Sequence, residues 1–169
     1  RVMTNAHVVA GTAAVTVDTE QGALDASVVL FDPAVDVAIL SVPGLTAAPL
    51  AFAPVPAESG ENAIVLGYPG GGPYTASAAR VRETLDLQGP DIYRSGTVER
   101  EVYTVRGLIQ QGNSGGPLVD AQGLVLGMVF GAAIDDSDTG FVLTAEEISR
   151  QLALAGSVFE PVETGVCIV

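Results

Sequence analysis

The chain has 169 residues, with seven positive side chains, all arginine, against twenty acidic ones, for a formal net charge of −13. Binding to a polyanion requires clustered cations, so this balance argues against nucleic acid and anionic membrane surfaces as partners. A chain of this length buries roughly 68–70% of its unfolded surface, which is enough for one compact unit that needs neither a metal nor a disulfide to fold.

Short apolar runs, broken by turn residues every ten or so positions, predict an all-β barrel or sandwich. The strands expected in the first half cover residues 15–18, 24–31 and 36–40, after a strand end at 1–4. The first two full strands flank a turn at 20–22 and are expected to pair as a hairpin. Pro33 ends that pairing, because proline has no N–H to donate.

A segment rich in proline and alanine, residues 43–56, is expected to link the two halves of the chain. Its prolines also exclude a membrane-spanning helix from the longest apolar region. The strands expected in the second half cover residues 62–67, 74–87, 92–100, 102–109, 117–119, 124–130 and 140–143. One helix is expected at 145–155, with Thr144 as its N-cap and Glu147 at the capping-box position.

Two loops suggest ligand sites, but the first is better explained as a turn and the second as a solvated loop. The glycines at 70–72 lack the Gly-Lys-Ser/Thr ending of a phosphate-binding loop, and no helix is expected after them. The acidic loop at 135–138 lacks the spacing and the closing glutamate of an EF-hand. We therefore expect no metal site and no cofactor.

The stretch Gly-Asn-Ser-Gly-Gly-Pro at 112–117 presents the hydroxyl of Ser114 on a sharp turn between two apolar runs. A serine is a nucleophile only when a base takes its proton and a third group orients the base. His7, the single histidine, is the candidate base. Asp36 is the candidate orienting acid, because a carboxylate leading into a buried strand needs a hydrogen-bond donor. Asp32 competes for that role, but its place before a proline suits a turn better.

The order His7, Asp36, Ser114 is that of chymotrypsin, and not that of subtilisin or the α/β-hydrolases. The chain also carries Thr-Asn-Ala-His at 4–7 and Asp-Val-Ala-Ile-Leu at 36–40. With these motifs it resembles the trypsin-like serine proteases, and within them the HtrA/DegP-like branch. The resemblance covers nearly the whole chain. The resemblance implies two six-stranded antiparallel β-barrels with a C-terminal helix. The first barrel is expected to be incomplete, because the strands that would open it are absent from this chain.

The same resemblance implies that the two barrels and a C-terminal tail form one protease domain. The N-terminal barrel would cover residues 1–53 and carry the histidine and the aspartate. The C-terminal barrel would cover residues 54–143 and carry the serine. Residues 144–169 would form the helix and the tail.

The resemblance also assigns roles to individual residues. His7 matches the general base, Asp36 the orienting acid and Ser114 the nucleophile that forms an acyl-enzyme. The backbone N–H groups of Gly112 and Ser114 match the oxyanion hole. The residues matched to substrate binding, in a cleft favouring apolar or small side chains, are Leu108, Val129, Phe130 and Gly131. Asn113 replaces the aspartate that in digestive members receives a freed N-terminus, as it does in HtrA-like members.

Cys167, the single cysteine, is either a small buried apolar residue or one half of a disulfide to an upstream segment in an oxidising compartment. Within the branch, the chain lacks a PDZ-like module and resembles a mycobacterial group of membrane-anchored periplasmic proteases. That resemblance implies a transmembrane part absent from this chain, work in the periplasm, and control by acid or oxidative stress.

Three hypotheses follow for function. The first is a serine endopeptidase acting on protein or peptide substrates. The second is a peptide-binding module that keeps the fold without catalysis, against which the complete set of three residues argues. The third is an enzyme that stays dormant until a disulfide or a pH change orders the oxyanion loop.

Overall fold

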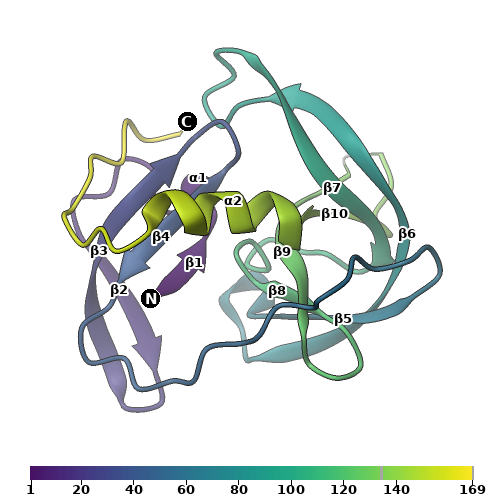
Figure 1. Cartoon of the computed structure of the whole chain (residues 1–169), viewed down its shortest axis with the longest axis horizontal. Helices are drawn as coiled ribbons and strands as arrows, with labels where there is room; N and C mark the ends of the chain where they lie inside the picture. The colour runs from purple at the N-terminus through teal and green to yellow at the C-terminus, as the bar shows by residue number, and fades with distance from the viewer. Residues whose placement is uncertain (134, 169) are drawn as a thin grey trace. The chain divides into compact units, whose positions relative to one another are not determined.

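The computed structural model describes residues 1–133 and 135–168, and Figure 1 labels its strands and helices. By its internal contacts the chain divides into two units, which we describe separately. Unit 1 consists of Arg1–Ala48, Gly89–Val98 and Gln151–Val169, and unit 2 of Pro49–Gln88 and Glu99–Arg150.

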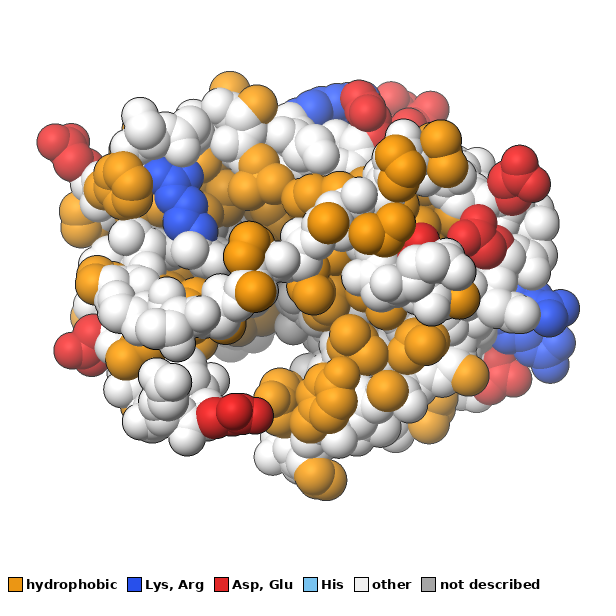
Figure 2. All heavy atoms as spheres, turned by 60° about the horizontal axis from the view of Figure 1, so that its bottom comes forward, with side chains coloured by type: hydrophobic (Ala, Val, Ile, Leu, Met, Phe, Trp, Pro, Cys, Tyr) orange, Lys and Arg blue, Asp and Glu red, His pale blue; other side chains and the backbone are white. Residues whose placement is uncertain are grey.

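Acidic side chains dominate the charged surface, as the composition requires. Figure 2 shows them at several separate places on one face of the molecule, and the arginine side chains on that face are also separate from one another, some of them beside acidic side chains. No helix in the described residues has the length and hydropathy that crossing a bilayer needs.

Unit 1 is built on a four-stranded antiparallel sheet in the order β1-β4-β3-β2. Its strands are β1 (Val2–Thr4), β2 (Val15–Thr19), β3 (Gly22–Asp32) and β4 (Val37–Ser41), and a single turn of helix, α1 (Ala6–Val9), follows β1. Alternating exposure along β2 matches its alternating sequence, as expected for a strand with one solvated face.

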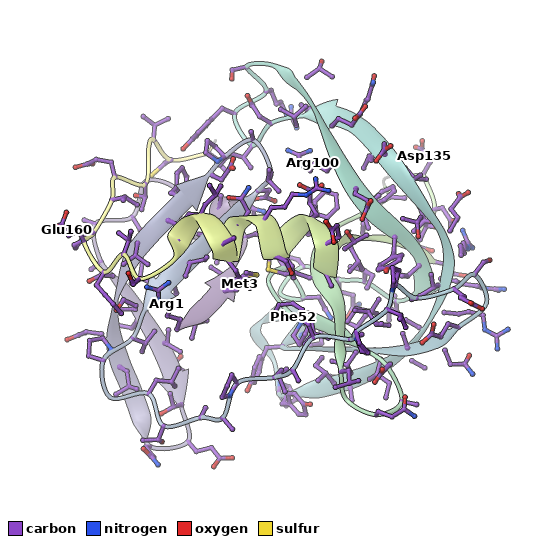
Figure 3. All side chains as sticks on the ribbon, viewed as in Figure 1. Arg1, Met3, Phe52, Arg100, Asp135 and Glu160 are labelled. Carbon is purple, nitrogen blue, oxygen red and sulfur yellow. The ribbon has the colours of Figure 1, made fainter. Side chains whose placement is uncertain are left out.

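The central strand β4 is buried on both faces, which explains its unbroken apolar sequence. Ala38 and Leu40 pack on one side with Val9 and Val28. Ile39 packs on the other side with the last turns of α2 (Ala145–Ala155), and Met3 joins this cluster. Figure 3 shows the labelled Met3 side chain beneath that helix.

Unit 2 is a closed six-stranded barrel in the order β10-β7-β6-β5-β8-β9. Its strands are β5 (Asn62–Gly67), β6 (Thr75–Pro90), β7 (Thr97–Gly107), β8 (Pro117–Val119), β9 (Val125–Ala132) and β10 (Thr139–Thr144), with a short 3-10 turn, η1 (Pro69–Gly71). The interior is filled by small and branched apolar side chains around Tyr103. The Tyr103 hydroxyl accepts a hydrogen bond from Ala57 N at 3.0 Å, and burial raises the pKa of this phenol.

The structure confirms the expected all-β fold with a C-terminal helix. Unit 2 is the expected six-stranded barrel, and unit 1 is an open sheet, as an incomplete barrel would be. Several expected strand bounds differ from the observed ones by one to three residues, and two further differences have an identifiable cause. The strand expected at 36–40 begins at Val37, and the strands expected at 92–100 and 102–109 are one strand, β7.

The missed boundary at residue 92 has a local cause. Asp91 accepts hydrogen bonds from the backbone N–H groups of Tyr93 and Ser95, and from the Ser95 hydroxyl. These bonds lower the pKa of Asp91, and the bond from the Ser95 hydroxyl has the largest effect. An aspartate that bonds the backbone two residues on closes a turn, so the chain turns here before β7 begins.

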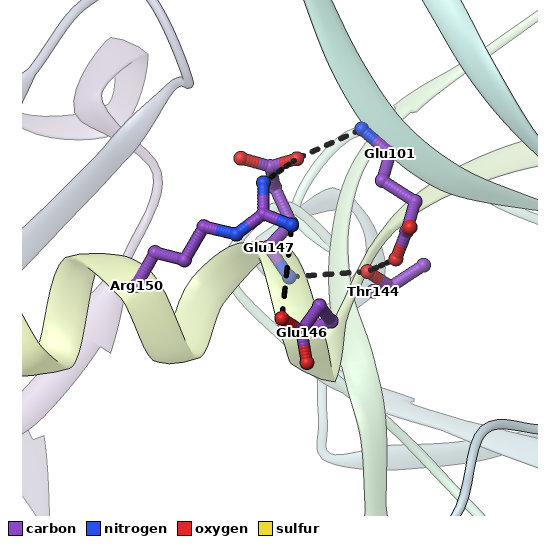
Figure 4. Close-up of polar contacts among 5 residues, drawn as sticks. All are labelled: Glu101, Thr144, Glu146, Glu147 and Arg150. Carbon is purple, nitrogen blue, oxygen red and sulfur yellow. Dashed lines mark hydrogen bonds and ion pairs between the residues drawn. The ribbon is translucent and has the colours of Figure 1, made fainter.

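Helix α2 is held at its N-terminus by the cap that the sequence predicts. The Thr144 hydroxyl accepts a hydrogen bond from Glu147 N at 3.1 Å and donates one to Glu101 Oε1 at 2.6 Å, and Glu147 Oε2 accepts from Glu101 N at 2.9 Å (Figure 4). Arg150 lies 3.7 Å from carboxylate oxygens of both Glu146 and Glu147. The helix start is therefore joined to strand β7 by both members of the capping box.

Thr144→Ala should lower the free energy of unfolding by about 1–2 kcal/mol, because it removes the N-cap oxygen and leaves a Glu101 oxygen without its donor. Urea denaturation measures the change. Thr144→Ser keeps the hydroxyl and should recover most of the loss. Equal stability of the alanine and serine variants would contradict the assigned cap.

Candidate active site

His7 and Asp36 are joined by two hydrogen bonds within unit 1, although they are 29 residues apart. His7 N donates to Asp36 Oδ1 at 2.9 Å, and His7 Nδ1 lies 2.7 Å from Asp36 Oδ2. The Asp36 side chain is 6% exposed and that of His7 is 32% exposed. An ionised carboxylate only accepts hydrogen bonds, so with Asp36 ionised the donor is Nδ1, and a neutral ring then has its lone pair on Nε2.

The strand register explains how these two residues meet. Strand β1 pairs with β4, with Thr4 opposite Ala38. The segment that leaves the end of β1 therefore runs beside the residue that precedes β4. The competing carboxylate, Asp32, accepts hydrogen bonds from the N–H groups of Ala34 and Val35 and shapes the turn, as its position before a proline suggests.

Ser114 lies in unit 2 on a loop in which three neighbouring N–H groups donate hydrogen bonds. Asn113 N donates to Gln110 O, Gly115 N to Val129 O, and Gly116 N to Asn113 O. Within the part of the chain that the structure describes, the N–H groups of Gly112 and Ser114 have no acceptor. Two free donors flanking one hydroxyl are the arrangement that stabilises a developing oxyanion.

The glycine run that the sequence analysis interpreted as a simple turn supports this loop. Gly70 N donates to Gln111 O at 2.7 Å. Gly112 has a φ of +93°, and a Cβ built on it would lie 2.5 Å from Tyr68 O and 3.0 Å from Gly70 N. Gly112 is therefore required by the close approach of the two backbones, whereas Gly70 and Gly71 have open space around them and positive φ values, as a tight turn requires.

Strand β9 has one edge that is only partly paired. Val129 N donates to Gly116 O at 2.9 Å, and Val129 O accepts from Gly115 N at the same distance. Beyond Val129, the described pairing of β9 continues with β10, through Gly131 opposite Phe141. The Phe130 ring lies 5.8 Å from the guanidinium of Arg100 and 6.2 Å from the ring of Phe141.

The remaining predicted residues occupy separate places. Leu108, in unit 2, is 55% exposed just after β7. Cys167, in unit 1, is exposed rather than buried, and its Sγ lies 3.7 Å from Gly11 O.

A pocket of about 680 Å³ in unit 1 is lined by His7, Ile92, Tyr93, Arg94, Val166, Cys167 and Ile168. Among the described residues, no cluster of His, Cys, Asp or Glu is arranged to hold a metal ion.

Gly112→Ala should destabilise the fold by about 2–3 kcal/mol, because the added Cβ clashes with backbone atoms as well as straining a positive φ. Gly123→Ala is the matched control, since Gly123 also has a positive φ but has open space around it. It should cost about 1 kcal/mol. Urea denaturation of both variants compares them, and a Gly112 variant as stable as the Gly123 variant would argue against close packing of the two loops.

Comparison with known proteins gives one family. Residues 1–128 match the trypsin-like peptidase domain. The serine protease Rv3671c of Mycobacterium tuberculosis, also called MarP, is 58% identical over 99% of this chain and 42% of its own length. The serine protease Do-like HtrB of Bacillus subtilis is 30% identical over 95% of this chain and 37% of its own length. The chain thus spans less than half the length of these curated relatives.

Solved structures agree with this assignment. The crystal structure titled as the active form of the Rv3671c protease superposes with a TM-score of 0.95 at 57% identity, covering 99% of this chain and 74% of that one. The structure titled as its inactive form gives a TM-score of 0.83, covering 92% and 79%. The expected likeness to a mycobacterial protease is confirmed, and because the family match covers most of its residues, the chain belongs to the trypsin-like peptidase domain family.

Proposed function

We propose that the chain is the catalytic domain of a serine endopeptidase, with His7 as general base, Asp36 as orienting acid and Ser114 as nucleophile. The observation that carries the proposal is the double hydrogen bond between His7 and Asp36. It holds the imidazole with Nδ1 protonated, which is the tautomer whose Nε2 accepts a proton. A histidine with only a structural role has no need of a buried carboxylate that bonds both its backbone and its ring.

The reaction would run in two steps. In the first, Ser114 Oγ attacks the carbonyl carbon of the scissile peptide while His7 Nε2 takes the hydroxyl proton and passes it to the leaving amine. In the second, water attacks the acyl-enzyme, its proton goes to Nε2 and then back to Ser114 Oγ, and the acid product leaves. Asp36 stabilises the imidazolium present in each step without taking its proton.

The oxyanion formed in each step would be bound by the N–H groups of Gly112 and Ser114. Their lack of acceptors in the described part of the chain supports this assignment. A preorganised donor of this kind contributes about 2.7–4 kcal/mol of transition-state stabilisation. The Gly70 contact to Gln111 would keep the loop in place as charge develops.

We assign the extended part of the substrate to the edge of β9 around Val129, Phe130 and Gly131. The backbone of Val129 is already bonded to Gly115 and Gly116, so the peptide would pair beyond it. A peptide adds to such an edge by backbone hydrogen bonds, and side-chain pockets then set specificity. Leu108, an exposed apolar side chain, supports a preference for apolar or small substrate side chains over basic ones.

The cellular setting belongs to this proposal as well. We place the domain in the periplasm as part of a stress or acid-resistance protease that is tethered by a transmembrane region outside this chain. Cys167 would then pair with an upstream segment. The exposure of its thiol, in the pocket beside His7, supports such a link.

A dormant state is a second candidate, because structures of a relative are titled as two forms. The relative Rv3671c has structures titled active and inactive, and this chain superposes better on the active one, with TM-scores of 0.95 and 0.83. A switch between two such forms by redox state would make activity depend on whether Cys167 is oxidised. Equal peptidase rates under reducing and oxidising conditions would remove the redox switch and leave the catalytic assignment untouched.

Cleavage of a denatured protein tests the nucleophile. Ser114→Ala should abolish product formation, because no other hydroxyl replaces the attacking group. Ser157→Ala, at an exposed serine near the end of α2, is the matched control and should cleave at the full rate. Residual cleavage at the control rate in the Ser114 variant would assign the activity to another residue.

Asp36→Asn should lower kcat by about 10⁴-fold with little change in KM, because the amide favours the wrong imidazole tautomer while the fold persists. Asp18→Asn, at an exposed position on β2, controls for the loss of one charge. Steady-state kinetics on a peptide substrate measure both. A fully active Asp36 variant would contradict the role of this carboxylate.

A further inference from the structure

The backbone of Asp36 has an unusual conformation. Its φ is +69°, and Asp36 and Arg94 are the non-glycine residues with positive φ in the described chain. The left-handed region favours glycine, because an L side chain there crowds its own backbone. A residue remains in it only when the surrounding structure holds it there. Asp36 is therefore held by contacts that can be identified.

The turn before β4 provides some of these contacts. Asp36 N donates to Asp32 O at 3.0 Å, and Asp32 Oδ1 accepts from Ala34 N at 2.9 Å and Val35 N at 3.0 Å. These bonds shape the turn up to the amide of Asp36. None of them engages the carbonyl of Asp36, on the far side of the strained φ.

Asn5 supplies that contact from another part of the sequence. Its Nδ2 donates to Asp36 O at 2.9 Å, and Asn5 is fully buried. Asn5 is also the N-cap residue of α1, a position where an asparagine side chain normally accepts from the first turn of the helix. Here the side chain makes no such cap bond. It is directed to Asp36 instead.

A second feature of Asn5 points the same way. Its Oδ1 is buried without a hydrogen-bond partner in the described part of the chain. An unsatisfied buried oxygen is unfavourable, so packing alone would prefer an apolar side chain at this position. The presence of an amide is explained by its donor, which bonds Asp36.

We propose that Asn5 is a positioning residue, which holds Asp36 in its left-handed conformation so that both carboxylate oxygens reach His7. Its consequence for catalysis rests on the function proposed above. Asp36 is fixed at three atoms by residues on one short segment, through its carbonyl to Asn5 and through Oδ1 and Oδ2 to His7. The segment that carries the base thereby sets the conformation of the acid that orients it.

Two substitutions separate the donor from other roles of Asn5. Serine caps helices about as well as asparagine but is too short to reach Asp36, and leucine keeps a similar size without a donor. Asn5→Ser and Asn5→Leu should each lower kcat roughly 10- to 100-fold, with KM within about two-fold, because the base is misoriented while substrate binding is kept. Asn62→Ser, at an exposed asparagine on β5, should keep full activity. Melting curves identify which variants are folded.

A double-mutant cycle shows whether Asn5 acts through Asp36. In an Asp36→Asn background, Asn5→Ser should cause less than about a three-fold further loss, because the two residues belong to one coupled unit. Independent, multiplicative losses would overturn the proposal.

A readout that needs no activity completes the test. Because His7 is the only histidine, ¹⁵N-histidine labelling gives one pair of imidazole nitrogen signals. At a pH where the ring is neutral, the unaltered protein should show Nδ1 protonated and Nε2 bare, and Asn5→Ser should show a mixture of tautomers. A folded Asn5→Ser variant with an unchanged tautomer and an unchanged kcat would overturn the proposal. If Asn5→Leu does not fold, the result for Asn5→Ser is sufficient to decide the question. If Asn5→Ser changes the tautomer but the unaltered protein has no peptidase activity, the positioning role of Asn5 is supported and the proposed endopeptidase function is contradicted.

Discussion

The pair of hydrogen bonds between His7 and Asp36 depends on the register of one antiparallel strand pair. Thr4 lies opposite Ala38, so the turn that leaves β1 and the turn that enters β4 lie side by side. A shift of one residue would move every side chain of β4 to the other face and separate the two groups. The apolar clusters on both faces of β4 oppose such a shift. The packing of this strand therefore fixes the geometry of the His7–Asp36 pair at its end.

Unit 2 positions its own part of the site by a different means, the close approach of glycine backbones. The loop that carries Ser114 is bonded to β9 through Gly115 and Gly116, and to the glycine turn through Gln111. A Cβ on Gly116 would collide with Leu66 O, on the neighbouring strand β5. The loop is held by main-chain atoms on both sides, and within the described residues the N–H groups of Gly112 and Ser114 keep no acceptor.

The sequence singles out the candidate residues by local signals, but it does not predict the backbone that positions them. His7 and Ser114 stand out because one is the only histidine and the other lies among glycines, and both signals are local. The bond from Asn5 to Asp36 joins residues 31 positions apart, and no local pattern signals it. Asp36 was expected to begin a strand because an apolar run follows it. A left-handed residue cannot continue a β ladder, so β4 begins one residue later.

The most direct test of this account is the intact mass of the protein, under non-reducing conditions, after exposure to a serine-directed fluorophosphonate. The account predicts one adduct in the unaltered chain and none in Ser114→Ala, because only an activated serine with an oxyanion site reacts with such a reagent. A folded chain that takes up no adduct, or one that is labelled equally with Ser114 replaced, would contradict it.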